Sequence, residues 1–289
     1  MKFYVSMAFS DAGEYLDLAR AVEAAGWDGM AISDHLVHPE TIATLYPYTA
    51  DGQRFWDGET PWLDPWVAIS AMAAVTERIE FVTYVYILPL RHPVQVAKMV
   101  GTAAALSNNR VKLGAGLGWM AEEFDSAGQS FKARGSRTNE SIEVIRLLLG
   151  GGMVEHHGKH YAFERMQMSP APSKPVPVLL GGLSETALRR AARLGDGWMS
   201  VIHGIDEMRD YVDTLAGYRR EYGREDLPFE IFGSSNEASG LDSYHRLEEA
   251  GVTSLVTVPW YLYGDEPFSF EQKVEGLKRF GGEVIEKMG

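Results

Sequence analysis

Residues 176–202, VPVLLGGLSETALRRAARLGDGWMSVI, contain two short apolar runs with a helix-like segment between them. The first and last runs have the nearly continuous apolar character of parallel strands that are covered on both faces. Ser184 is a favourable helix N-cap, and the segment that follows it ends at Gly195. This strand, helix, strand order predicts a parallel α/β unit.

The same pairing of strand and helix recurs along the whole chain of 289 residues. Eight pairs are expected. The expected strands are at 2–9, 27–33, 78–88, 110–116, 176–182, 196–202, 229–235 and 253–259. The helices that follow them, in the same order, are at 14–26, 64–75, 93–106, 139–151, 184–195, 206–223, 241–251 and 268–282. A doubly wound open sheet is the alternative, but eight uninterrupted units exceed what it usually needs. We therefore predict an α/β fold, a TIM-like (β/α)8 barrel forming a single domain over residues 1–289.

Two segments interrupt this rhythm and predict insertion loops at the C-terminal rim of the barrel. Residues 38–63 form a long stretch rich in turn-forming and aromatic residues. Residues 153–175 suggest a hairpin or an extended excursion that ends in prolines. Long ordered loops in compact domains tend to be functional lids.

Composition restricts the class of protein. The formal net charge of -13 argues against a nucleic-acid partner and against an anionic membrane surface. The chain has no cysteine, so disulfides and thiolate metal sites are excluded. Neither a signal peptide nor an apolar run long enough to cross a bilayer is evident, so we expect a cytoplasmic protein.

The segment VKLGAGLGWMAEEF, residues 111–124, invites comparison with the dinucleotide-binding fingerprint G-x-G-x-x-G. That fingerprint needs its third glycine one position after Gly118, and it usually opens the first strand-helix unit rather than the fourth. The segment instead predicts a barrel strand whose small residues let a flat or phosphorylated ligand approach its C-terminal end. A tight turn without a ligand is the alternative.

Candidate functional residues follow the second and fifth strands, where barrel enzymes carry their catalytic side chains. Asp34 and His35 come directly after the second strand, and a carboxylate beside a histidine can set its tautomer. Gly181 and Gly182 precede the N-cap Ser184, so a phosphate could rest on the helix terminus there. A structural histidine and a plain strand-to-helix turn are the competing interpretations.

Two further clusters contain charged or metal-binding residue types. HHGKH, with His156, His157 and His160, has no cysteine or evident carboxylate partner, so no metal site is predicted. Lys132, Arg134 and Arg137 form a basic group in an acidic chain, which indicates either a solvated face or the site of an acidic ligand tail.

With these residues identified, the chain resembles the luciferase-like flavin monooxygenase superfamily, and within it the oxidoreductases that depend on the deazaflavin coenzyme F-420. The resemblance covers most of the chain. It rests on SDHL at 33–36, on LPLRHPVQVAKMVGTAAALSNNRVKLGAGLGWMAEEF at 88–124, and on VPVLLGGLSETALRRAARLGDGW at 176–198.

The resemblance implies a flavin-shaped cofactor, F-420 or alternatively FMN, at the C-terminal ends of the strands. It implies a non-prolyl cis peptide between Tyr84 and Val85 behind the cofactor ring. The resemblance and the rim positions together give a set of expected cofactor contacts: Asp34, His35, Tyr84, Val85, Gly116, Leu117, Gly118, Trp119, Gly181 and Gly182. The related sugar-phosphate dehydrogenases place an acidic Glu at the position of Trp119, so its absence argues against sugar-phosphate oxidation.

The leading hypothesis is an F-420-dependent oxidoreductase that exchanges a hydride with a small organic substrate, as a homodimer. His35, oriented by Asp34, is expected to move the accompanying proton. The substrate wall is expected from Tyr46, Tyr48, Phe55, Trp56, Trp62, Trp119, His203 and Trp260. The alternatives are an FMN-dependent two-component monooxygenase and a catalytically silent flavin-binding barrel.

Overall fold

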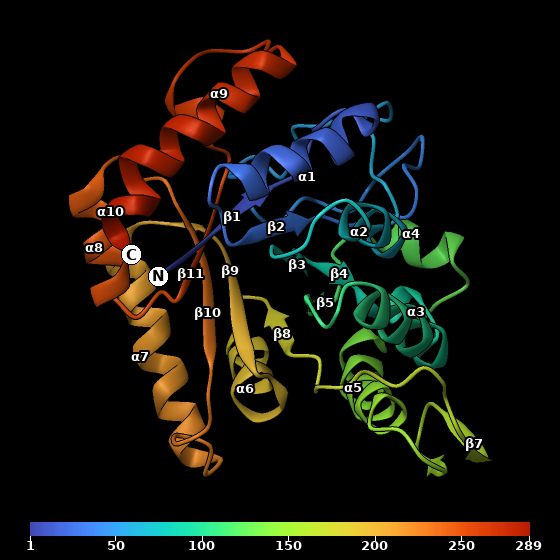
Figure 1. Ribbon diagram of the computed structural model, residues 1–289. Coiled ribbons are helices and arrows are strands. Elements are labelled where there is room, and N and C mark those ends of the chain that lie inside the picture. Colours follow the sequence, from blue (N-terminus) through green and yellow to red (C-terminus); the bar gives the residue numbers. More distant parts are fainter.

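The computed structural model describes all residues from Met1 to Gly289 and has at its centre a closed barrel of eight parallel strands (Figure 1). The barrel strands are β1 (Lys2–Ser6), β2 (Gly29–Ile32), β3 (Glu80–Thr83), β5 (Val111–Gly116), β8 (Val178–Gly181), β9 (Gly197–His203), β10 (Glu230–Ser235) and β11 (Ser254–Thr257). Their order is β3-β2-β1-β11-β10-β9-β8-β5, and the β3–β5 pairing closes the ring. The predicted TIM-like barrel is therefore confirmed, and the open-sheet alternative is excluded.

Each barrel strand is followed by a helix on the outside of the barrel (Figure 1). These helices are α1 (Tyr15–Ala24), α2 (Pro65–Ala73), α3 (Pro93–Leu106), α5 (Arg134–Leu149), α6 (Glu185–Leu194), α7 (Ile205–Glu221), α8 (Leu241–Glu249) and α9 (Phe270–Phe280). The large apolar core lies between this helical layer and the barrel. None of the helices combines the length and the apolar character that a membrane span needs.

The structure departs from the predicted elements in three places. The third strand, expected as one run over 78–88, is divided into β3 and β4 (Tyr86–Ile87), and the predicted cis peptide joins Tyr84 to Val85 between them. The acidic run after Trp119 forms a short helix, α4 (Ala121–Ser126), and α5 begins five residues before the predicted start at 139. A last short helix, α10 (Glu286–Met288), follows a π-helical turn at Gly281–Ile285.

The two insertions differ in regularity. Residues 38–63 contain no helix or strand, although Tyr46 N donates to Gly52 O at 2.8 Å within the loop. Residues 153–175 contain an antiparallel hairpin of β6 (Val154–His157) and β7 (Ala162–Met166), which extends away from the barrel on the side of α5 (Figure 1). Glu140 of α5 holds the hairpin by accepting hydrogen bonds from the backbone N–H groups of His160 and Tyr161.

The barrel interior is filled rather than open. Seven side chains, one from each barrel strand except β5, form a small apolar cluster: Tyr4, Ala31, Val82, Leu179, Met199, Phe232 and Val256. At the N-terminal end of the barrel, Lys112 donates to Glu230 at 2.6 Å and lies 3.1 Å from Glu80. Although burial acts to raise the pKa of Glu80, the Lys112 charge and the Tyr4 hydroxyl bring it below its ordinary value. This ionic network closes one end of the barrel.

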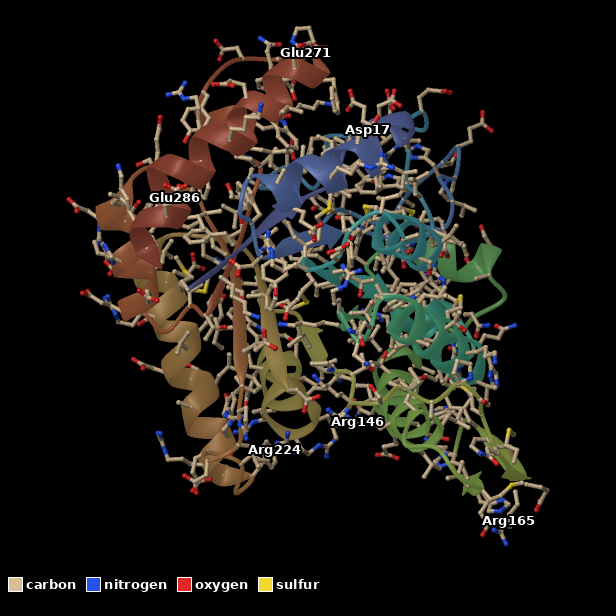
Figure 2. The ribbon with its side chains drawn as sticks, in the orientation of Figure 1. Asp17, Arg146, Arg165, Arg224, Glu271 and Glu286 are labelled. Atoms are coloured by element: carbon tan, nitrogen blue, oxygen red, sulfur yellow. The ribbon has the colours of Figure 1, made fainter.

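A second charged cluster lies at the same end of the barrel, around Asp196, the residue that precedes β9. Arg146 of α5 donates to its carboxylate at 2.6 Å, and Arg224 approaches the other oxygen at 4.0 Å. Both arginines lie at the lower edge of the molecule in Figure 2. Asp196 also accepts the N–H of Val178 at 2.9 Å, so the cluster ties α5 to the start of β8.

Candidate active site

Asp34 is buried at the C-terminal end of β2, but it does not contact His35 through its carboxylate. One carboxylate oxygen accepts a hydrogen bond from the N–H of Ile87 at 2.8 Å. Both terminal nitrogens of Arg91 also donate to the carboxylate, Nη2 at 2.8 Å. Burial raises the pKa of Asp34, while the Arg91 guanidinium and the Ile87 N–H act in the opposite direction. The guanidinium also lies over the Tyr86 ring, 4.4 Å from its centroid. Asp34 therefore fastens the end of β2 to the segment after β4.

His35 is oriented by Glu123 of α4, which corrects the expectation that Asp34 orients it. Its Nδ1 lies 3.1 Å from Glu123 Oε2, and the other carboxylate oxygen accepts the N–H of Leu36 at 2.6 Å. Glu123 is 1% exposed, so both oxygens are held by short contacts in a buried position. Because Nδ1 faces a carboxylate, it carries the proton, and Nε2 is left as the nitrogen that can accept or donate a proton.

Aromatic side chains surround His35. The rings of Trp62, Trp56 and Trp119 have centroids 5.1, 5.4 and 6.3 Å from the imidazole. Tyr46 packs edge-on against Trp119 at 5.2 Å and against Trp56 at 5.0 Å. The long loop therefore folds over the C-terminal end of β2 and leaves the His35 side chain 12% exposed. Such an apolar enclosure excludes water from a reacting group.

The glycines of β5 allow close packing within the barrel wall. A Cβ on Gly114 would lie 1.9 Å from Thr83 O, and one on Gly116 would lie 2.5 Å from Val85 Cγ2. Gly118 has a φ of +77°, which suits a residue without a side chain. The space beside Gly114 and Gly116 is thus filled by protein atoms, not left for a ligand. Contact of Gly116 with a cofactor stays a prediction.

The end of β8 and the start of α6 form a turn at a helix N-terminus, here called the α6 cradle. Gly182 has a φ of +118°, and the Ser184 side chain accepts the N–H of Ala187 as the N-cap of α6. Arg190 of α6 is 8% exposed and donates to Asn139 of α5 at 2.7 Å. Burial and the nearby charges of Arg193 and Arg134 lower the pKa of Arg190. An anion at the α6 N-terminus would relieve this repulsion.

These features fit the phosphate of a flavin-shaped cofactor. Gly181 ends β8 and Gly182 follows it before the α6 N-terminus, and Arg190 of α6 has no carboxylate partner. Trp62 Nε1, beside His35, and His203 Nε2, at the end of β9, are buried without a hydrogen-bond partner. Buried polar groups of this kind normally have partners, so they are available to a bound molecule. The donor set is that of an anionic, hydrogen-bonding organic ligand.

Trp260 and the HHGKH histidines do not join the site, and His203 has a partner on one side only. Trp260 is 4% exposed and belongs to the main core, where its backbone packs against Gly276, so it does not line the rim. His203 is 6% exposed and pairs with Glu207 at 2.9 Å, beside the ring of Tyr211. The histidines of HHGKH diverge, since His156 contacts Glu140 and His160 contacts Ser136. Groups of three or more potential metal ligands are absent.

The basic group of the sequence is also dispersed. Lys132 is exposed, and Arg134 stacks on the Phe131 ring with 3.7 Å between the guanidinium carbon and the ring centroid. Arg137, one helical turn from Arg134, is buried and lines a pocket with His92 at the start of α3 and with His160 and Tyr161 of the hairpin. The three residues therefore do not form a single patch.

Sequence reasoning missed Glu123 and Arg91. Glu123 stands in an acidic run that suggests solvent exposure, yet it lies three positions after Met120 and next to Phe124, both of which are buried. Helical spacing over that run was the available signal. No local pattern marks Arg91 as the partner of Asp34, because 57 residues separate them and only the barrel brings them together.

Comparison with known proteins agrees with this architecture. The model of the family described as luciferase-like monooxygenase matches residues 4–275. An uncharacterised protein of Mycobacterium tuberculosis is 39% identical over the full length of both chains. An F-420-dependent glucose-6-phosphate dehydrogenase of Nakamurella multipartita is 31% identical over 70% of this chain and 55% of its own.

Solved structures with the same fold are more distant in sequence. The monooxygenase RslO1 of Streptomyces bottropensis superposes with a TM-score of 0.78 at 18% identity, with all of both chains covered. An F-420-dependent secondary alcohol dehydrogenase, solved with an F-420-acetone adduct, gives a TM-score of 0.77 at 17% identity over 99% of each chain. At this level of identity the likeness establishes the fold alone.

Proposed function

The chain belongs to the luciferase-like monooxygenase family of flavin- or deazaflavin-dependent oxidoreductases, and we propose that it transfers a hydride between coenzyme F-420 and a small organic substrate. The observation that carries this proposal is the pair of His35 and Glu123, enclosed by three tryptophans at the C-terminal end of β2. In barrel enzymes that end is where chemistry occurs.

In such a reaction the residues of this chain move a proton and hold the cofactor. When bound, the deazaflavin supplies a carbon centre that gives or takes a hydride, and it is unsuited to oxygen chemistry. Because hydride transfer to or from a carbonyl or alcohol needs a proton at oxygen, His35 Nε2 exchanges that proton with the substrate. Glu123 fixes the His35 tautomer and the orientation of its ring. The cradle at Gly181, Gly182 and Arg190 holds the cofactor phosphate.

The preference for F-420 over FMN rests on similarity to an F-420-dependent relative, because the α6 cradle would bind either cofactor. A relative that is 31% identical carries F-420 dependence in its name. Trp119, which borders the His35 enclosure, offers no acid at the place where sugar-phosphate dehydrogenases are expected to have one. We therefore propose a substrate other than a sugar phosphate, small enough to fit beside Trp56, Trp62 and Trp119.

Equilibrium binding to the purified protein tests the cofactor assignment. We expect oxidised F-420 to bind with a shift of its absorbance spectrum, and FMN to bind more weakly or not at all. Tight binding of FMN without binding of F-420 would replace the proposal with an FMN-dependent monooxygenase. Tight binding of F-420 without reduction or oxidation across a broad panel of alcohols, ketones and enones would indicate a catalytically silent barrel.

A further inference from the structure

Arg137, in the first turn of α5, is a buried cation without a protein partner. It is 8% exposed, its Nη1 is buried without a hydrogen-bond partner, and none of the ion pairs in the molecule includes it. The other buried arginines are satisfied in part or in full. Arg190 donates to Asn139, and Arg219 donates to the carbonyls of Arg224 and Leu227. Burial of an unpaired charge is costly, so a partner for Arg137 is expected.

Arg137 lines an open cavity of about 290 Å³ between α5, the N-terminus of α3 and the β6–β7 hairpin, and His92 and Ser130 on its wall are exposed to solvent. The lining is almost entirely polar: His92, Gln129, Ser130, Arg137, His160 and Tyr161. A cavity of this size holds several waters or a phosphate or carboxylate group, since one water takes about 30 Å³ of liquid volume. No acidic side chain is among the lining residues.

His92 adds a second donor to the cavity. Its Nδ1 accepts the N–H of Val94 at 3.3 Å, so the neutral ring carries its proton on Nε2. Burial and the charge of Arg137 lower the pKa of His92, which agrees with the placement of both groups around one cavity. His160, whose Nε2 lies 2.9 Å from Ser136 Oγ, and the Ser130 hydroxyl complete a ring of groups able to donate hydrogen bonds.

The acid closest to Arg137 along α5 is committed elsewhere. Glu140 accepts the N–H of Tyr161 at 2.8 Å and that of His160 at 2.9 Å, and it lies 3.3 Å from His156 Nε2. Although burial acts to raise the pKa of Glu140, these backbone hydrogen bonds bring it below its ordinary value. Glu140 therefore anchors the hairpin as a carboxylate and leaves the Arg137 charge uncompensated.

We propose that this cavity binds an oxyanion, a carboxylate or a phosphate, with Arg137 as its main charge partner and His92 as a second donor. The site is separate from the α6 cradle and does not depend on the identity of the cofactor. The anion comes either from solution or from the acidic end of a ligand that lies on the rim.

Calorimetric titration of the cofactor-free full-length protein with inorganic phosphate, and separately with glutamate, tests the site. We expect saturable binding of at least one anion, and a loss of affinity of roughly ten- to a hundredfold in Arg137→Met, because a hydrogen bond to a charged group is removed. Lys132→Met, which removes an exposed charge from the same stretch of sequence, is the matched control and should bind as the wild type does.

A second measurement remains decisive if Arg137→Met does not fold. In the wild type, NMR titration of the His92 ring should show that phosphate or glutamate raises the pKa of His92, since an anion favours the protonated imidazole. Arg137→Lys should retain part of this response. Absence of saturable binding by either anion, or binding that leaves the His92 titration unchanged, would refute the proposal.

The source of the anion is separated by comparing F-420 that carries its glutamates with F-420 from which they have been removed. If the ligand tail occupies the cavity, Arg137→Met weakens binding of the first form and leaves the second unaffected. If the anion comes from solution, the substitution leaves the affinity for both forms unchanged, and phosphate binding to the wild type persists beside the cofactor. Failure of F-420 to bind would bear on the proposed function alone, because the phosphate titration needs no cofactor.

Discussion

The two ends of the barrel differ in how their charged and aromatic groups are partnered. At the N-terminal end, Lys112 is neutralised by Glu80 and Glu230, and Asp196 is held by Arg146. At the C-terminal end, the carboxylates of Asp34 and Glu123 have partners, but Arg137 Nη1 and His203 Nε2 have none. Unpartnered polar atoms occur at the N-terminal end as well, at Arg224 Nε and Ser254 Oγ, but Phe9 and Phe55, which are 46% and 68% exposed, lie at the C-terminal end. Exposed rings beside unpartnered polar groups are available to bind other molecules.

The largest effect expected at the C-terminal end is that of His35→Asn. Loss of a positioned general acid or base lowers kcat by about 10²- to 10⁴-fold, while cofactor affinity and folding stability remain near the wild-type values. Steady-state kinetics and cofactor titration measure the two effects separately. His38→Asn is the matched control, because His38 lies in the same loop and contacts Arg54 instead. Full turnover in His35→Asn would remove the proton role.

The variant Glu123→Gln tests whether Glu123 positions His35 for the reaction or only stabilises the fold. Loss of the negative charge weakens the contact that orients His35 Nδ1, so kcat should fall by roughly tenfold or more while KM and cofactor affinity change little. Asp34→Asn should instead lower stability and leave kcat per folded molecule in place, because its carboxylate contacts Arg91. A lower kcat at full stability in Asp34→Asn, with no change of kcat in Glu123→Gln, would restore the original pairing of Asp34 with His35.

Lys112→Met probes the N-terminal end and should have the smallest effect on activity. It leaves Glu80 and Glu230 without their shared cation, and because these carboxylates are 28% and 30% exposed the loss in stability should be moderate, about 2 kcal/mol. Urea unfolding measures the loss, with exposed Lys174→Met as the control. Turnover per folded molecule should not change. A large loss of kcat at full stability would show that the two ends are coupled.

Much of the fold was accessible from the sequence because its signals are local. Apolar runs of strand length, each followed by a helical pattern, recur often enough to close a barrel. The strands and helices of the structure follow one another in the expected order. The positions of Asp34, His35, Gly181 and Gly182 at strand ends follow from the same pattern, as do the N-cap Ser184 and the hairpin after α5. The cis peptide between Tyr84 and Val85 was predicted from the family resemblance, since no local propensity predicts it.

The pairing of side chains was decided by the tertiary structure. Asp34 and His35 are adjacent in sequence, yet their carboxylate and imidazole have different partners, at Arg91 and Glu123, which are 57 and 88 residues away. The end of a strand fixes the position of the backbone, but the direction of each side chain depends on the nearest complementary charge. In the same way, Lys132, Arg134 and Arg137 form one cluster in the sequence but have three different environments in and before the first turn of α5. Residue type and spacing determined the barrel and its rim, whereas burial and charge compensation across the barrel determined which groups remain free to bind or react.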